Sequence, residues 1–236
     1  SIRAWVGGIN HRYFQYDHLR ESTKRQVGST FKPVVYASAL EQGVRPCSFT
    51  SAEKILYTNM KDWAPVNSDS ENYKLLYSMP GALAHSVNTV SVQLLEKAGI
   101  DNTVKLARRL GIRSELEPVP SLALGSANIS VIEMVTAYTA FVNKGAVVKP
   151  YYLTSIVSHD DELLEKFSAE PPQEAMSAES AQMILQMLRR AVSEGGTSGG
   201  LRSTYVLPND IGAKTGTTQS NTDGWLIAVT PKLVKV

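Results

Sequence analysis

The sequence predicts an α+β fold, in which an antiparallel sheet lies beside a group of helices. Segments with helix signals occupy much of residues 33–192, whereas only a few short stretches have the character of strands, and these do not alternate with the helices. The chain has no internal repeat and no heptad pattern, which argues against solenoid and coiled-coil folds.

Length and composition indicate one globular domain over residues 1–236. The 236 residues are 43% hydrophobic and 19% charged, enough to bury a sizeable core. A formal net charge of +2 is too small to argue for nucleic acid or an anionic membrane surface as a partner. No apolar run approaches the ~20 residues of a membrane span. The single cysteine, Cys47, excludes an internal disulfide.

The first predicted elements are a strand and a helix. Residues 2–8 alternate well enough for a strand, and a polar, aromatic loop follows. A helix is expected from Val34 to Gln42, closed by Gly43. Pro33 conflicts with helical geometry at the residue before it, Lys32, so the start of this helix is expected to be irregular.

The middle of the chain predicts an irregular connection followed by three helices. Residues 44–77 are rich in turn formers and are expected to run along the surface. Helices are expected over residues 80–85 and 89–98, and the polar triplet Ser86-Val87-Asn88 separates them. Asp101 is expected to cap a third helix that ends at Leu110.

The second half of the chain contains both helix and strand signals. Ser130 and Glu133 match a capping box for a helix that runs to Gly145. The other expected elements are strands 147–158 and 162–167 around a turn, a helix from Ser177 to Val192, a glycine- and serine-rich segment 193–203, and strands 211–218 and 225–230.

Ser29 and Lys32 are the candidate nucleophile and base. They lie three residues apart at the start of a predicted helix, where i and i+3 side chains share one face about 5–6 Å apart. A serine hydroxyl is a weak nucleophile, and an adjacent unprotonated amine can activate it. Lys32 can serve as base only if burial or a nearby cation lowers its pKa.

Local context selects among similar short patterns. Ser51-Ala-Glu-Lys54 repeats the serine–lysine spacing, but only Ser29 has a preceding glycine and a following apolar helix, which place its N–H at a positive helix end suited to an oxyanion. Ser86-Val-Asn88 interrupts two helices, whereas Ser126-Ala-Asn128 precedes a helix and is expected to help cap it. Lys214-Thr-Gly216 occurs once, on a strand whose glycine leaves room for a substrate backbone.

Other polar groups are weaker candidates. The four histidines are scattered without ligand spacing, so no metal site is predicted. Asp160-Asp161 is expected in a hairpin turn. The segment from Gly195 to Gly200 lacks the Gly-Lys-Ser/Thr ending of a phosphate loop, and we expect no cofactor.

In their order, Ser29-Thr-Phe-Lys32, Ser86-Val-Asn88 and Lys214-Thr-Gly216 resemble the three motifs of the penicilloyl-serine transferases. Further segments are similar to the transpeptidase domain of bifunctional, class A penicillin-binding proteins: Trp63–Asn67, Leu106–Gly111, Pro120–Gly125, the helix with Glu133, Met134, Tyr138 and Phe141, Lys214–Gln219 and Asp223–Trp225. The resemblance implies a β-lactamase/transpeptidase-like fold, with an antiparallel sheet flanked by helices and a helical subdomain.

The resemblance also implies roles for single residues. Ser29 would be the acylated nucleophile and Lys32 its base, Ser86 would relay protons to the leaving amine, and Lys214 would bias Lys32 electrostatically. Asn88 would hold the substrate amide. Thr215 and Thr217 would bind the terminal carboxylate beside Gly216, and the backbone N–H groups of Ser29 and Thr217 would form the oxyanion hole.

The implied activity is a peptidoglycan D,D-transpeptidase with donor and acceptor stem peptides as partners and β-lactams as covalent inhibitors. The same motifs also fit a D,D-carboxypeptidase, a β-lactamase or a penicillin sensor. A class A β-lactamase needs a water-activating Glu-x-x-x-Asn loop, and neither Glu115 nor Glu117 stands in that pattern. We therefore rank the transpeptidase first.

The resemblance leads us to expect that residues 1–236 are a fragment of a longer chain. In the family, one strand precedes the strand expected at Ile2, and a strand and helix follow the segment that ends at Val236. The sheet is therefore expected to be incomplete. A class A parent would add a membrane anchor and a glycosyltransferase domain, and would place this chain at the periplasmic, extracytoplasmic face of the bacterial inner membrane.

Overall fold

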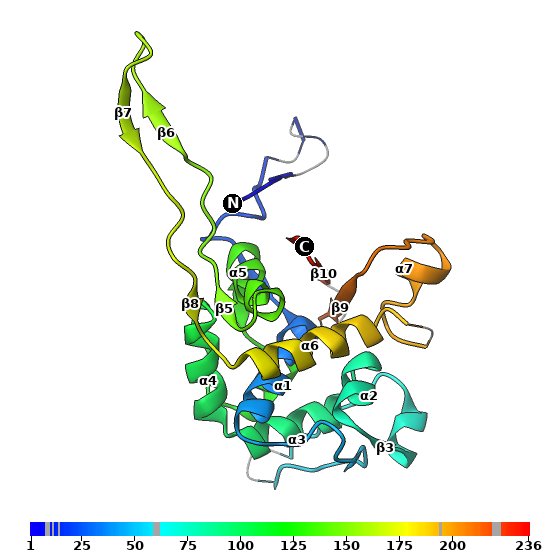
Figure 1. The fold of residues 1–236 in the computed structure, drawn as a ribbon. Helices are drawn as coiled ribbons and strands as arrows, with labels where there is room; N and C mark the ends of the chain where they lie inside the picture. The colour runs from blue at the N-terminus through cyan, green and yellow to red at the C-terminus, as the bar shows by residue number, and fades with distance from the viewer. Residues whose placement is uncertain (8–9, 11, 14, 59–61, 194, 219–222) are drawn as a thin grey trace.

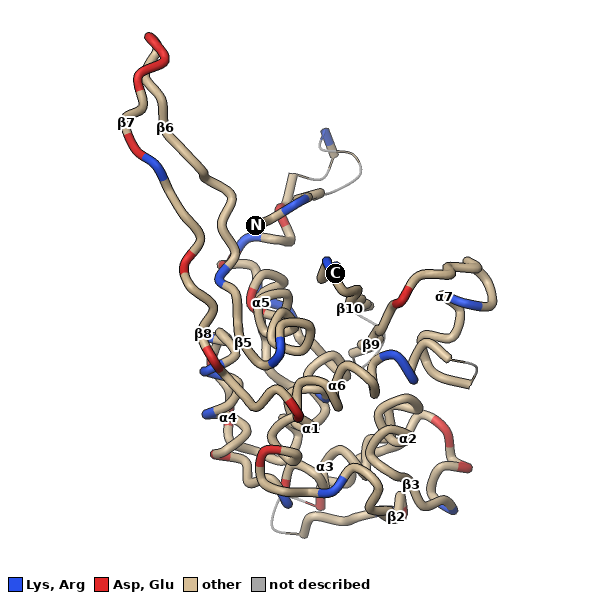
Figure 2. The backbone as a smooth tube through the Cα atoms, in the orientation of Figure 1, with Lys and Arg blue, Asp and Glu red and all other residues tan. Residues whose placement is uncertain are grey.

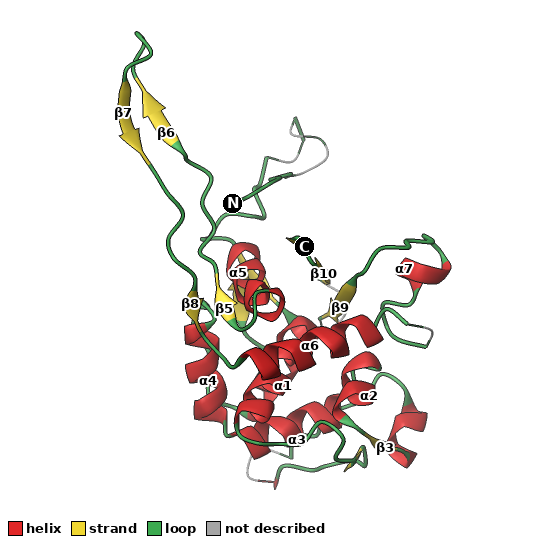
Figure 3. Cartoon of the chain, viewed as in Figure 1, coloured by secondary structure: helices red, strands yellow, loops and turns green. Residues whose placement is uncertain are grey.

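The computed structural model describes residues 1–7, 10, 12–13, 15–58, 62–193, 195–218 and 223–236 (Figures 1 and 3). Gly8 of the first predicted strand, His11, and Gln219 of the third motif region lie outside the described residues.

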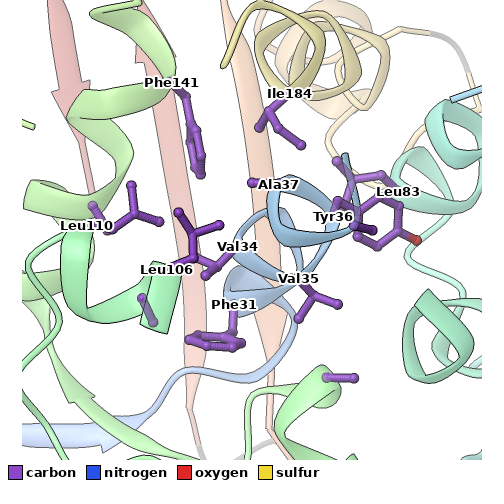
Figure 4. Packing of buried hydrophobic residues seen from close by; sticks show 14 of the residues in the cluster. Phe31, Val34, Val35, Tyr36, Ala37, Leu83, Leu106, Leu110, Phe141 and Ile184 are labelled. Carbon is purple, nitrogen blue, oxygen red and sulfur yellow. The ribbon is translucent and has the colours of Figure 1, made fainter. Parts of the chain in front are cut away.

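Helix α1 (Lys32–Glu41) forms the centre of the molecule. Its residues are buried from Lys32 through Ala39, which is typical of a helix that is apolar on nearly every side. It packs against α3 (Asn88–Ala98), α4 (Ile100–Arg109) and α6 (Ala178–Arg190). Figure 4 shows its side chains beside Leu83, Leu106, Phe141 and Ile184 of four other helices and beside Leu110, which directly follows α4.

The other helical segments in the described part of the chain extend this arrangement. They are the 3-10 turn η1 (Gly28–Phe31), which runs directly into α1, the 3-10 turns η3 (Ser70–Lys74) and η4 (Pro120–Leu124), and the helices α2 (Met79–Ala84), α5 (Val131–Val142) and α7 (Gly200–Ser203). None of the helices formed by the described residues is long and apolar enough to cross a membrane.

The main sheet has three antiparallel strands in the order β11-β10-β9. These are β9 (Gly212–Thr217), β10 (Gly224–Thr230) and β11 (Leu233–Lys235). On β10, Trp225, Ile227 and Val229 are buried, whereas Leu226 between them is 40% exposed. Helices α5 and α6 contact this sheet, so helices cover its buried face. The predicted α+β class with antiparallel strands is confirmed.

Four further antiparallel pairs join segments around this core. β1 (Lys24–Gln26) pairs with β4 (Asn128–Ser130), β2 (Thr50–Ser51) with β3 (Leu76–Tyr77), β5 (Ala146–Val147) with β8 (Gln173–Glu174), and β6 (Ser155–Val157) with β7 (Leu163–Lys166). The β6–β7 hairpin projects away from the body, and its tip carries Asp160, Asp161 and Glu162 (Figure 2). Asp160-Asp161 therefore lies in a hairpin turn, as predicted.

Several predicted boundaries are confirmed. Ser130 and Glu133 form both hydrogen bonds of a capping box at the start of α5. The Ser177 side chain caps α6 by accepting a hydrogen bond from the N–H of Ser180.

Three sequence-based predictions are wrong. Residues 2–7 form no strand, because an alternating sequence becomes a strand only when it pairs with a second strand. Among the described residues, their backbone forms one hydrogen bond, from Ile2 N to Tyr151 O. The predicted strand 147–158 is interrupted, since Pro150 lacks the N–H that a ladder needs. Gly99, not Asp101, occupies the N-cap of α4, so Asp101 lies in the first turn.

Candidate active site

A pocket of about 280 Å³ lies where η1, the start of α3 and the end of β9 meet. Ser29, Asn88 and Thr217 all line it, so residues of the three sequence motifs share one cavity. Its other lining residues come from the segment after Trp63, from the region of η4, and from positions next to the motifs: Gln26, Gly28, Trp63, Ala64, Pro65, Val66, Ser121, Leu124, Ser126 and Thr218. No Asp or Glu is among these lining residues, which all belong to the described part of the chain.

Ser29 lies on η1, immediately before α1, and is half-buried at the pocket. Gly28 before it has a φ of +53°, and a Cβ at this position would lie 2.9 Å from Thr217 O. The glycine therefore allows η1 to approach the end of β9 closely. Pro33 occupies the first turn of α1, where a missing N–H leaves no helical bond unmade, and Lys32 keeps helical dihedral angles despite the proline.

The Lys32 side chain is fully buried and points to the second motif. Its Nζ lies 2.6 Å from Ser86 O, 2.6 Å from Asn88 Oδ1 and 3.1 Å from Ser86 Oγ. A hydrogen bond between Lys32 and Ser29 Oγ is not formed among the described residues, although both lie at the start of one helix. The two close acceptors on the second motif account for this direction of the side chain.

Lys214 is the second buried lysine of the site. It is fully buried, and its Nζ donates to Ser86 Oγ at 3.0 Å and to Thr215 O at 2.8 Å. The Ser86 hydroxyl therefore bridges the two lysine nitrogens. Within the described chain, no salt bridge joins an Asp or Glu to either lysine. Two buried amines without a counter-ion are costly to keep charged.

Both lysine pKa values are lowered. Burial lowers the pKa of Lys32 well below its usual value, and the charge of Lys214 lowers it further. Burial brings the pKa of Lys214 to about 7. A neutral lysine amine has two N–H donors and one lone pair. Ser86 O and Asn88 Oδ1 occupy the two donors of Lys32, so its lone pair is left to accept a proton from a hydroxyl.

Ser86 is held in an uncommon backbone conformation. Its φ is +55°, in the left-handed region that non-glycine residues rarely adopt. The turn lies between α2 and α3 and presents both the carbonyl and the hydroxyl of Ser86 to Lys32. Backbone strain of this kind clusters at functional sites.

On β9, Thr217 is exposed to the pocket, whereas Thr215 is half-buried and its carbonyl is engaged by Lys214. A Cβ on Gly216 would lie 2.8 Å from both Val27 O and Thr30 Cγ2. The sequence indicates that Gly216 leaves room for a substrate backbone, but the space beside it is filled by η1. The packing of η1 against β9 by itself requires a glycine at this position.

Two serines that line the pocket, Ser121 and Ser126, have no functional role assigned from the sequence. Ser126 was expected to cap a helix, but Ser130 is the cap of α5, and Ser126 instead lines the pocket with Ser121, whose Oγ donates to Ser126 Oγ at 3.3 Å. Gly125 brings this segment close, because its carbonyl accepts a hydrogen bond from Gly28 N at 3.0 Å. The similarity of residues 120–125 to the family was the available signal.

The glycine- and serine-rich segment 193–203 has the composition of a mobile or ligand-binding loop. Its described residues do not line the pocket. Thr197 N donates to Ala84 O at 3.0 Å, and Ser198 is buried, so part of the segment is anchored on α2. In the part of the chain that the structure describes, no three His, Cys, Asp or Glu side chains gather to hold a metal ion.

The sequence pattern of the penicillin binding protein transpeptidase domain matches residues 9–235. The chain belongs to this family. Penicillin-binding protein 1A of Aquifex aeolicus is 34% identical over 99% of this chain and 32% of that protein. The same protein of Neisseria gonorrhoeae is 29% identical over 99% of the chain and 30% of its own length. The chain thus spans about a third of these relatives. The predicted membership of the class A transpeptidase domains is confirmed.

Solved structures of penicillin-binding proteins share this fold. The crystal structure of penicillin-binding protein 1A from Haemophilus influenzae superimposes with a TM-score of 0.84 at 27% identity, over 94% of this chain and 38% of that one. The D,D-transpeptidase domain of a peptidoglycan glycosyltransferase from Eggerthella lenta gives a TM-score of 0.77 at 24% identity, over 92% and 59%. At that identity the second likeness supports the fold alone.

Proposed function

We propose that this penicillin-binding transpeptidase domain is a serine D,D-transpeptidase. It forms an acyl-enzyme on Ser29 with a D-Ala-D-Ala stem peptide and passes the acyl group to the amine of a second stem peptide. The observation that carries the proposal is the Ser86 hydroxyl, which lies 3.1 Å from Lys32 Nζ and 3.0 Å from Lys214 Nζ. Lys32 also contacts Asn88, which lines the same pocket as Ser29. This arrangement joins a base, Lys32, to a proton relay, Ser86, and the base lies three residues along the chain from the nucleophile Ser29.

In the first step, neutral Lys32 accepts the proton of Ser29 Oγ as that oxygen attacks the carbonyl between the two D-alanines. An ester bond forms and, through a tetrahedral intermediate, the peptide C–N bond breaks. The proton passes from Lys32 through Ser86 to the departing amine. Ser86 is suited to this relay, because its hydroxyl lies within hydrogen-bond reach of Lys32.

In the second step, the acceptor amine attacks the Ser29 ester. The amine's proton returns through Ser86 to Lys32, and Lys32 gives a proton back to Ser29 Oγ as the ester breaks. The oxyanion of each tetrahedral intermediate is assigned to the backbone N–H groups of Ser29 and Thr217. The close approach of Gly28 to Thr217 supports this assignment, since it brings η1 and the end of β9 together.

Substrate binding is assigned to the second and third motifs. Asn88 Nδ2 donates one hydrogen bond to Val66 O at 2.5 Å, which leaves its second N–H for a substrate carbonyl. The hydroxyls of Thr215 and Thr217, beside Gly216, are assigned to the terminal carboxylate, and Lys214 in its protonated form adds positive charge there.

β-Lactams are proposed to acylate Ser29 in the same way. Structures of penicillin-binding protein A from M. tuberculosis are described as acyl-enzyme complexes with ceftriaxone and with imipenem, and their likeness to this chain, at 21% identity, supports the fold alone. Rapid hydrolysis of such an ester needs an activated water. Glu115 and Glu117 are exposed, and no acidic residue lines the pocket among the described residues, so we place β-lactamase activity below transpeptidation.

The periplasmic face of the inner membrane is the proposed location.

The experiment incubates the domain with a D-Ala-D-Ala-ending peptide, with and without an amine acceptor, and follows D-alanine release and cross-linked product. We expect release with cross-linked product when the acceptor is present. Release with only hydrolysed product would assign a D,D-carboxypeptidase. No release, combined with a stable penicillin adduct, would assign a sensor.

A further inference from the structure

Helix α3 begins at Asn88 without a cap of its own. Its N-cap residue is Val87, whose apolar side chain accepts no hydrogen bond. The first N–H groups of a helix have no partner within the helix and need an acceptor from elsewhere. Thr89, in the first turn, is fully buried, so water is not available to its N–H.

The missing acceptor is the side chain of Asn67, which comes from an irregular segment 21 residues earlier. Asn67 Oδ1 accepts a hydrogen bond from Asn88 N at 2.9 Å and from Thr89 N at 3.1 Å. One carbonyl oxygen therefore replaces the side-chain cap that Val87 cannot provide.

Asn67 is itself held on all sides. It is 5% exposed, and its Nδ2 lies 3.2 Å from Thr89 Oγ1 and 3.5 Å from Ala52 O. Its backbone N donates to Tyr73 OH at 2.9 Å. With the polar groups of its side chain engaged, the amide is fixed and cannot reach substrate.

Val66, the residue before Asn67, also binds Asn88. Val66 O accepts from Asn88 Nδ2 at 2.5 Å, so the Asn88 amide must turn its Oδ1 the other way, where it lies 2.6 Å from Lys32 Nζ. The dipeptide Val66-Asn67 therefore binds both the backbone and the side chain of Asn88.

We propose that Asn67 is a positioning residue of the acylation site: by capping α3 it fixes Asn88, and through Asn88 it fixes the orientation of the Lys32 amine. The inference rests on the proposed function only where acylation is the readout. Asn67 touches neither Ser29 nor the lysines, so its effect on the reaction is transmitted through α3.

Three variants test the proposal. Asn67→Ala removes the acceptor. Asn67→Asp keeps an oxygen for the N–H groups of Asn88 and Thr89, and the Thr89 hydroxyl, which donates to Ala52 O at 3.0 Å, lies within reach of its second oxygen. Asn143→Ala is the matched control, because Asn143 is a half-buried asparagine whose Nδ2 likewise donates to a backbone carbonyl, that of Ala146, away from the pocket.

The first readout is the second-order rate of Ser29 labelling by fluorescent penicillin. Small displacements of reacting groups can lower rates by about 100-fold, and we expect Asn67→Ala to be about 10- to 100-fold slower than wild type. Asn67→Asp should recover most of this loss, and Asn143→Ala should label like wild type. A merely structural role predicts instead that folded Asn67→Ala labels at the wild-type rate, since only the stability of the fold would then depend on the cap.

The second readout does not depend on acylation. Hydrogen exchange of the Asn88 and Thr89 amides should be faster in Asn67→Ala, and near wild type in Asn67→Asp and Asn143→Ala. Unchanged exchange in Asn67→Ala would overturn the proposal, as would equal labelling rates for folded Asn67→Ala and Asn67→Asp. If Asn67→Ala does not fold, an Asn67→Asp variant that folds but labels as poorly as Ser29→Ala overturns it. If wild type itself is not labelled, the proposed function fails, and the exchange result still decides the role of Asn67.

Discussion

At the scale of single residues, the site is defined by two buried lysines that form no ion pair with a carboxylate of the described residues. Burial disfavours the charged form of each, and the Ser86 hydroxyl lies between their nitrogens. Buried amines of this kind lower the stability of the fold, so two of them beside a pocket indicate a functional site. The Ser29–Lys32 spacing in the sequence indicates a nucleophile and a base, but it could not reveal that Lys32 contacts Ser86 and Asn88, because those contacts span more than fifty residues.

The Lys214 pKa has a consequence for stability. Its value of about 7 in the folded protein lies below the ~10.4 of an unfolded chain, so the unfolded state binds more protons between these values. The free energy of unfolding should therefore rise with pH across this window. Lys214→Met, which removes the amine, should reduce the rise. Urea unfolding of wild type and Lys214→Met at several pH values measures the free energies of unfolding. A difference between the two free energies that stays constant with pH would show that the pKa of Lys214 is not lowered.

At the scale of elements, η1 is clamped between β9 and the segment after η4 by glycine contacts. A Cβ on Gly125 would lie 1.9 Å from Gly28 O, and Gly125 has a φ of +73°. Position 125 therefore requires glycine for two reasons: its φ is positive, and a side chain would collide with Gly28. This clamp holds Ser29 at the pocket and could not be predicted from the sequence, because the residues in contact are nearly one hundred positions apart.

Gly125→Ala should destabilise the protein and slow labelling of Ser29. Gly43→Ala is the matched control, because Gly43 also has a positive φ, of +82°, but nothing lies within 4 Å of its Cβ position. The control should cost about 1–2 kcal/mol for the left-handed conformation alone, and Gly125→Ala should cost clearly more. Denaturant unfolding and penicillin labelling measure both effects. Equal losses in the two variants would show that the close contact is unimportant.

Glu133 at the start of α5 gives a prediction in the acidic range. Burial would raise its pKa, but hydrogen bonds from Ser130, Ser114 and the Arg113 N–H outweigh it and bring the pKa to about 2. Since this lies below the ~4.3 of an unfolded glutamate, its stabilising contribution is present above that value and is lost as pH falls toward 2. Glu133→Gln should therefore be less stable than wild type at pH 7, and the difference should shrink on acidification. A difference that grows at low pH would contradict this.

At the scale of the whole molecule, the body and the β6–β7 hairpin are distinct. The hairpin strands are exposed along their length, whereas the site is assembled from η1, α3 and β9 around the central α1. Elements with strong local signals, such as the capping box of α5, follow from the sequence. The strand expected at residues 2–8 does not, since a strand also depends on a partner elsewhere in the chain.

Replacement of residues 155–166 by a short turn should leave the active site intact. Since these residues contribute little buried surface, the free energy of unfolding should change by less than about 1 kcal/mol, and the rate of penicillin labelling should stay at the wild-type level. Thermal unfolding and labelling kinetics measure the two quantities. Loss of labelling in a folded variant would show that the hairpin takes part in the site.

The central claim is that Ser29 is the acylated nucleophile. The most direct measurement is mass spectrometry of the protein after incubation with benzylpenicillin, followed by proteolysis to locate the adduct, with Ser29→Ala as control. The account predicts one penicilloyl group on the peptide that contains Ser29 and none on the variant. An adduct on another residue, or an equal adduct on Ser29→Ala, would contradict it.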